Sequence, residues 1–271
     1  LNLSVRDRRI LMLAGVAGGI GAIFKAPLSG ALFAAEVLYR DPDFEHDAVI
    51  PGVISSVTAY SIFTQFEGHE RIIRLVDSTN RELPALVFPS PGGSVPAELL
   101  HYAVLSGLCA LVAYIFVKAL HLFEHRLFKP LPLPQVAKPA LGGVMLGLLV
   151  LVMGFAFSDL RPIGFHPGEL MAGGNSFLQA VVSNVLQTAP VESSITMKMA
   201  GFFAVIVLGK IVATSLTIGS GGSGGLLFPA VFLGGMTGAA YAKFCRALHD
   251  AGYLPAILAL PPNTRAGLIL V

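Results

Sequence analysis

One glycine-rich segment, Gly219–Pro229, has the residue types and spacing to bind an anion. It reads Gly-Ser-Gly-Gly-Ser-Gly-Gly-Leu-Leu-Phe-Pro and joins two apolar runs, Met199–Ile218 and Leu226–Tyr241. The second run is predicted to be a helix. The first N–H groups of a helix have no partner within it, and the helix dipole places about half a positive charge there. Because glycine has no Cβ, this backbone can approach a ligand closely, and the segment predicts an anion site built from main-chain amides.

The same segment is expected to lie at membrane depth, because no charged residue occurs between Ile211 and Ala242. Irregular backbone is tolerated there only where it is buried in protein or lines a wet cavity, since each unpaired N–H or C=O loses its water. Interrupted helices with their N-termini at mid-membrane hold ions in transporters. These features together indicate a protein that transports anions across a membrane.

The composition is that of an integral membrane protein. Of the 271 residues, 54% are hydrophobic and only 13% are charged, against about 25% charged in soluble domains. Several apolar stretches reach the ~20 residues that a helix needs to span a bilayer. The formal net charge of +2 is too small to indicate a nucleic acid partner, and no cofactor or metal is predicted. We therefore expect an all-α, multi-pass protein embedded in a lipid bilayer.

The apolar runs predict a single membrane domain over residues 1–271. Its parts are a helix pair and a third span in 1–64, an external charged loop in 65–96, two long spans in 97–157, a loop and partial helix in 158–197, and the glycine-loop region in 198–271. Basic residues around 6–9, 40 and 126–138 place their loops in the cytoplasm by the positive-inside rule, and we expect the cell membrane as the location. The chain is expected to be an interior piece of a longer protein, because it starts just ahead of a helix and stops in an apolar run.

Glycines at four-residue spacing predict close helix packing. Gly15 and Gly19 lie in the first apolar run, and Gly143 and Gly147 lie in the span Lys138–Phe157. Small residues at this spacing let two helix backbones approach each other within a membrane. We therefore expect these pairs at helix contacts.

Two stretches resemble the CLC family of chloride channels and chloride/proton antiporters. Lys25–Glu36, which reads Lys-Ala-Pro-Leu-Ser-Gly-Ala-Leu-Phe-Ala-Ala-Glu, is similar to that family's Ala-Pro-Leu-x-Gly helix pair. Gly225–Pro229 is similar to its Gly-x-Phe-x-Pro anion motif. The resemblance covers essentially the whole chain but only the middle of the family's membrane domain. It implies part of a CLC-like inverted-repeat bundle of tilted and broken helices, which forms a homodimer with one anion pathway per subunit.

The resemblance also implies roles for individual residues. The amides of Leu226 and Leu227 would bind the central anion, chloride or a similar monovalent ion, and Leu227 stands where the family usually has Phe. The implied anion-binding residues are Gly225, Leu226, Leu227, Phe228 and Pro229. The implied supporting loop consists of Gly219, Ser220, Gly221, Gly222, Ser223 and Gly224. Three further family segments, which carry a serine ligand, a gating glutamate and a late tyrosine ligand, are not found in this sequence.

The mode of transport depends on Glu36 and Val37. In the family's antiporters two adjacent glutamates typically close this short helix, and the second passes protons to the cytoplasm. Here the pair aligns as Glu36-Val37, and valine cannot carry a proton. We therefore predict passive, channel-like transport, with chloride/proton antiport through Glu36 or a water chain as the alternative. Glu36 could instead form an i,i+4 pair with Arg40 that steadies the helix end.

Lys210 lies inside an apolar helical run. A buried lysine raises the local electrostatic potential and would attract chloride. The alternative is that its ammonium group snorkels to the cytoplasmic mouth or pairs with an acid. The sequence leaves both interpretations open.

Two patterns suggest other classes of protein. Gly219–Gly224 matches the dinucleotide-binding pattern G-x-G-x-x-G but lacks the strand that must precede it. His121–His125 reads His-Leu-Phe-Glu-His and matches an inverted zinc-protease pattern. Because no third ligand is evident nearby, we interpret these histidines as interfacial anchors, and we do not expect an enzyme. A non-transporting scaffold or regulatory fragment is the alternative from a different class, but it gives no reason for an uncharged glycine loop.

Overall fold

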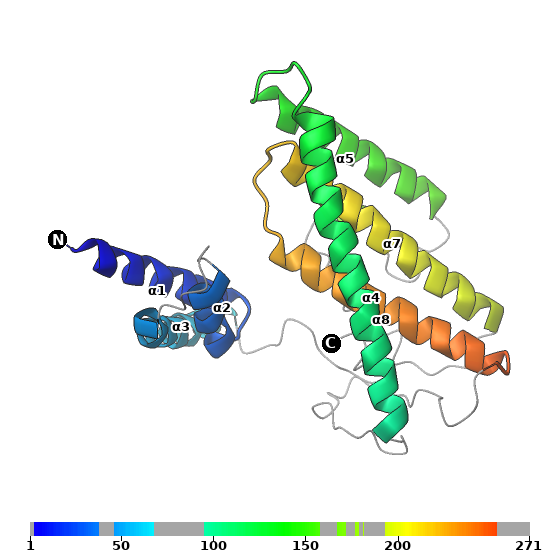
Figure 1. Cartoon of the computed structure of the whole chain (residues 1–271), viewed down its shortest axis with the longest axis horizontal. Helices are drawn as coiled ribbons and strands as arrows, with labels where there is room; N and C mark the ends of the chain where they lie inside the picture. Colours follow the sequence, from blue (N-terminus) through cyan, green and yellow to red (C-terminus); the bar gives the residue numbers. More distant parts are fainter. Residues whose placement is uncertain are drawn as a thin grey trace. The chain divides into compact units, whose positions relative to one another are not determined.

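The computed structural model of the chain describes residues 3–37, 46–67, 95–157, 167–171, 177–178, 181 and 193–253. Every regular element among these residues is a helix, so the all-α prediction is confirmed (Figure 1). Four of these helices are long and apolar enough to cross a membrane, namely Asp47–Glu67, Leu99–Phe128, Ala137–Ala156 and Met197–Gly219. The chain divides into two compact units, Leu1–Ile72 and Ile73–Val271.

The described residues of the first unit form three helices: α1 (Val5–Ile23), α2 (Pro27–Val37) and α3 (His46–Glu67). α1 begins at a side-chain cap, in which the Ser4 hydroxyl oxygen accepts a hydrogen bond from the Asp7 N–H at 3.1 Å. Such a cap satisfies one of the first amides of the helix. Each of the three helices contacts the other two.

A tight turn separates α1 from α2, at the break that the sequence predicted. Lys25 has a left-handed backbone with a φ of 52°, and its N–H donates to the Ala22 carbonyl at 3.2 Å. The Ala26 N–H donates to the Gly21 carbonyl at 3.1 Å. The two bonds form a Schellman motif, which satisfies carbonyls at the helix end. Pro27 then begins α2, where its fixed φ suits the first helical turn.

Small residues bring the helices of the first unit into backbone contact. A Cβ added at Gly30 of α2 would lie 2.6 Å from the Gly21 nitrogen of α1. Ala17 and Ala31 are buried close by, at the same α1–α2 contact. Because the backbones touch here, any larger side chain at Gly30 must push the two helices apart.

The glycines predicted to pack on α1 lie on the wrong face for this contact. Gly15 and Gly19 have nothing within 4 Å of an added Cβ among the described residues. Gly18 and Gly21 make the close approaches instead, with Gly18 against Ser55 of α3. α1 therefore packs through the face that carries Gly18 and Gly21, and not through the face of the predicted pair Gly15 and Gly19.

Replacement of Gly30 by alanine is expected to lower the melting temperature of the protein. The new methyl group would overlap the Gly21 backbone, and overpacking of this kind costs about 1–3 kcal/mol. Gly15→Ala is the matched control, since its Cβ meets nothing within 4 Å and alanine favours a helix over glycine. Thermal unfolding in detergent, followed by circular dichroism, compares the two. Equal melting temperatures for both variants would contradict the α1–α2 contact.

In the described part of the second unit, six helical elements have defined bounds. These are α4 (Val95–Leu122), the π-helical turn η1 (Phe123–Phe128), α5 (Ala137–Ala156), the 3-10 helix η3 (Pro167–Leu170), α7 (Ser193–Gly219) and α8 (Leu227–Asp250). α7 is the central element, because it contacts all five others. α4 crosses α8, as Figure 1 shows. Phe203 of α7 and Met236 of α8 are among the largest fully buried side chains, and both belong to the hydrophobic core of this unit.

The outer faces of the long helices are apolar. Leu111 on α4 and Leu148 and Phe155 on α5 are all more than half exposed. Side chains of this kind are stable on a surface that lipid covers, because the hydrocarbon core is itself apolar. With the four membrane-length helices, these faces confirm the prediction of an integral membrane protein.

The range 97–157, in which the sequence predicts two long spans, covers most of α4, then η1 and α5. Gly143 and Gly147 have nothing within 4 Å of an added Cβ among the described residues, so they do not mark a contact of α5 with its neighbours here. Most of the predicted loop at 65–96 and most of the part at 158–197 lie outside the described residues, while residues 65–67 and 95–96 belong to α3 and α4.

Candidate functional site

The first residues of the glycine segment end α7 in a second Schellman motif. Gly221 has a φ of 88°, and its N–H donates to the Ile218 carbonyl at 2.9 Å. The Gly222 N–H donates to the Thr217 carbonyl at 3.0 Å. Glycine adopts this left-handed conformation without steric cost. The motif satisfies carbonyls at the end of α7 that would otherwise have no partner in the helix.

Two other elements approach this turn at backbone distance. A Cβ added at Gly219 would lie 3.1 Å from the Glu124 nitrogen of η1, and one added at Gly142 of α5 would overlap the Ser220 side chain. Ser220 is buried, and its hydroxyl donates to a carbonyl of α7 at 2.9 Å. The turn is therefore fixed in place by η1 and by α5.

α8 begins at Leu227, within one residue of the start that the sequence predicted. Its N-cap residue is Leu226, which makes no side-chain hydrogen bond to the helix end. Pro229 lies in the first turn, where a missing N–H costs little. The helix thus lacks the polar side-chain cap that is usual at this position. The positive end of its dipole favours a negative charge at this turn.

A cavity of about 290 Å³ lies against the first turn of α8. One part of its wall comes from the glycine segment and α8, through Gly225, Phe228 and Pro229. Another part comes from α7, through Lys210 and its neighbours on the same helix face. The cavity can hold a monovalent anion together with several water molecules.

The structure brings together six of the residues singled out from the sequence. The cavity is lined by Ser223, Gly224, Gly225, Phe228, Pro229 and Lys210. Leu226 and Leu227 are not among its lining residues, and the Leu226 side chain is 44% exposed. Gly219, Ser220, Gly221 and Gly222 form the supporting turn rather than the cavity wall.

Lys210 is held between three elements. Its side chain is only 1% exposed. The Nζ atom donates to the Leu170 carbonyl of η3 at 3.0 Å and lies 5.2 Å from the centre of the Phe232 ring of α8. An aromatic face stabilises a cation at this distance. The ammonium group therefore points into the protein and does not snorkel to solvent.

Two hydroxyl residues of this wall were missed by the sequence reasoning. Thr214 and Thr217 line the cavity beside Lys210. Thr217 donates its hydroxyl hydrogen to the Ala213 carbonyl at 3.0 Å, while Thr214 is buried. The signal that could have found them is the helical spacing i, i+4 and i+7 from Lys210, which places all three on one face of α7.

Glu36 and Val37 end α2 in the first unit, whereas the cavity belongs to the second. The Glu36 side chain is exposed in the first unit. Arg40, its suggested partner, lies outside the described residues. The part of these two residues in proton transfer therefore stays a prediction from the sequence.

Comparison with known proteins yields one family. The model of the family described as voltage gated chloride channel matches residues 1–261. No solved structure matches the chain.

Three relatives illustrate the range of described activities. Chloride channel protein CLC-e of Arabidopsis thaliana is 26% identical over 90% of this chain and 31% of its own length. The H(+)/Cl(−) exchange transporter ClcA of Vibrio vulnificus is 26% identical over 89% of this chain and 44% of its own. The voltage-gated ClC-type chloride channel ClcB of Escherichia coli is 30% identical over 88% of this chain and 47% of its own. The chain spans about half, or less, of the length of these relatives.

Replacement of Gly221 by alanine is expected to destabilise the protein by about 1 kcal/mol, because a Cβ is strained at its φ of 88°. Gly225→Ala is the matched control. It lies in the same segment, its added Cβ meets nothing within 4 Å, and its φ is not positive. Melting temperatures in detergent compare the two variants. A larger loss for Gly225→Ala than for Gly221→Ala would contradict the turn described here.

Proposed function

Because the chain belongs to the voltage-gated chloride channel family, we propose that it forms part of a transmembrane route for chloride and similar monovalent anions. The observation that carries the proposal is the cavity that the first turn of α8 shares with Lys210. A helix N-terminus and a lysine both favour negative charge, and they line the same space. A scaffold would have no use for this pairing.

The chemistry of the cavity suits a transported anion. Main-chain amides near Gly225, Leu226 and Leu227 would replace part of the water shell of the ion, as helix N-termini do at other anion sites. Lys210 adds a full charge, but its ammonium group is already bonded to the Leu170 carbonyl. The lysine therefore attracts the anion without a strong direct pair. Conduction requires binding of this moderate kind, which lets the ion leave again.

Passive, channel-like transport is the mode that the sequence favours. Val37 stands where the second glutamate of the family's antiporters would pass protons, and a valine side chain has no ionisable group. The named relatives include both chloride channels and an H(+)/Cl(−) exchange transporter. Chloride/proton antiport is therefore the second candidate. We further propose a homodimer with one route per subunit, on the basis of the family resemblance.

Replacement of Lys210 by methionine is expected to weaken chloride binding about tenfold, which corresponds to ~1.4 kcal/mol. Methionine keeps most of the side-chain volume and removes the charge from the cavity wall. Lys198→Met is the matched control, because Lys198 lies on the same helix but is exposed. Isothermal titration of the purified full-length protein with chloride measures both. Equal affinities in the two variants would argue against a role for Lys210.

The transport mode is tested by anion efflux from liposomes with the external pH recorded at the same time. The full-length wild type is expected to release chloride without moving protons. Val37→Glu supplies the missing acid and is expected to add proton movement to the efflux. If the wild type takes up protons against the proton gradient, driven by a chloride gradient, this result would contradict the assignment as a channel. No efflux of any anion would support the scaffold alternative.

A further inference from the structure

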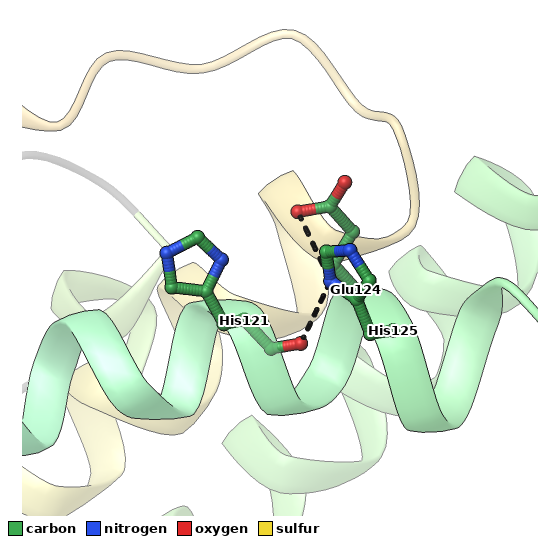
Figure 2. A group of neighbouring side chains, drawn as sticks. All are labelled: His121, Glu124 and His125. Atoms are coloured by element: carbon green, nitrogen blue, oxygen red, sulfur yellow. Dashed lines mark hydrogen bonds and ion pairs between the residues drawn. The ribbon is translucent and has the colours of Figure 1, made fainter.

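Three side chains with metal-binding atoms gather near the end of the long first span of the second unit. His121 belongs to α4, and Glu124 and His125 belong to η1. One nitrogen or oxygen atom from each lies within 4.8 Å of the other two. Figure 2 shows the two imidazole rings and the carboxylate on the same side of the helix. The sequence analysis noted the pattern His-Leu-Phe-Glu-His but interpreted the histidines as interfacial anchors, whereas the structure places the Glu124 carboxylate close to both rings.

The helix is irregular at this group. The α-helix changes to a π-helix at Phe123, and the Lys129 N–H donates to the Glu124 carbonyl at 2.8 Å, five residues back. π-helical turns occur frequently at functional sites. The ring centroids of His121 and His125 are 6.0 Å apart. All three side chains are exposed, so side-chain rotation can bring their ligand atoms toward one ion, for which metal–ligand distances are about 2.0–2.2 Å.

One histidine is already oriented by the backbone. Nδ1 of His125 lies 3.2 Å from the His121 carbonyl oxygen. A carbonyl can only accept, so this contact requires the proton on Nδ1 and leaves the lone pair on Nε2. A histidine that binds a metal through one nitrogen commonly donates its other N–H to such a carbonyl. His125 is therefore held in the tautomer that a metal ligand needs.

We propose that His121, Glu124 and His125 form a binding site for a divalent transition metal ion such as Zn²⁺. Two imidazoles and one carboxylate supply three ligands, and water would occupy the fourth position. Imidazole nitrogen favours zinc and its neighbours over Mg²⁺ or Ca²⁺, which prefer oxygen ligands. The site lies outside the cavity at α8, so it is not part of the proposed anion site.

The bound metal would act on the glycine turn. The Glu124 nitrogen lies against Gly219, where an added Cβ would be 3.1 Å away. Glu124 also lines a second cavity of about 550 Å³ with Lys129, Lys138 and Ser220. A divalent ion bound to Glu124 would change the net charge at the wall of this second cavity from negative to positive. The bound ion would then raise the rate at which anions enter, an effect that rests on the proposed function.

Metal binding itself is tested first, and it does not depend on transport. Zn²⁺ is titrated into the full-length protein, purified without a histidine tag, in competition with a chromogenic chelator. We expect one Zn²⁺ per chain, with affinity lowered at least about tenfold by His121→Ala, by His125→Ala and by Glu124→Gln. His249→Ala is the control, since His249 is also exposed and also lies beside a carboxylate.

Two outcomes would overturn the site. One is a wild type that takes up no stoichiometric zinc. The other is a zinc affinity that the cluster variants and His249→Ala change equally, which would place the ion elsewhere, such as at Cys109 or Cys245.

Regulation is tested by chloride efflux at low salt with and without Zn²⁺. The wild type is expected to show at least about a twofold higher initial rate with zinc, and His125→Ala no change. Zinc that binds at the cluster without changing the efflux would refute the regulatory role but leave the site standing. Absence of efflux with and without zinc, beside intact zinc binding, would refute the proposed transport function instead.

Discussion

Backbone hydrogen bonding inside a membrane is the constraint on which the second unit depends. A helix that stops at membrane depth leaves carbonyls unpaired at one end, and its successor leaves N–H groups unpaired at the other. Between α7 and α8 the carbonyl end is closed by the Gly221–Gly222 turn. The amide end at Leu226 has no side-chain cap. In the proposed anion site, the amide end of α8 would favour a negative charge in the cavity, and Lys210 would add to this effect.

Close contacts between backbones hold α7, α8 and the turn between them in position. Gly142 and Gly219 leave room for α5 and η1 to press on the turn, and Lys210 connects α7 with η3 and α8. In the first unit Gly30 has the same function between α1 and α2. Because packing between helices in lipid gains little from the hydrophobic effect, small residues and single polar contacts determine where the helices meet.

Much of this arrangement could be predicted from the sequence. Gly and Pro residues mark helix ends clearly in this sequence, so the start of α8 was predicted to within one residue and the break before Pro27 was predicted correctly. The packing faces could not be predicted, because glycine spacing does not say which side of a helix meets a partner. Gly142, adjacent to the predicted Gly143, makes the contact of α5. The pattern at His121–His125 was noticed, but the convergence of its three side chains could not be predicted, since the relative directions of side chains at a π-helical turn depend on the backbone.

The most direct test of an anion site at the N-terminus of α8 is anomalous X-ray scattering from crystals of the full-length protein soaked in bromide. Bromide is a monovalent anion that the amide site should accept in place of chloride. The expected result is a peak in the cavity bounded by Lys210, Gly225 and Phe228, and a weaker peak in crystals of Lys210→Met. Ordered bromide elsewhere in the protein, with no peak in this cavity, would contradict the assignment.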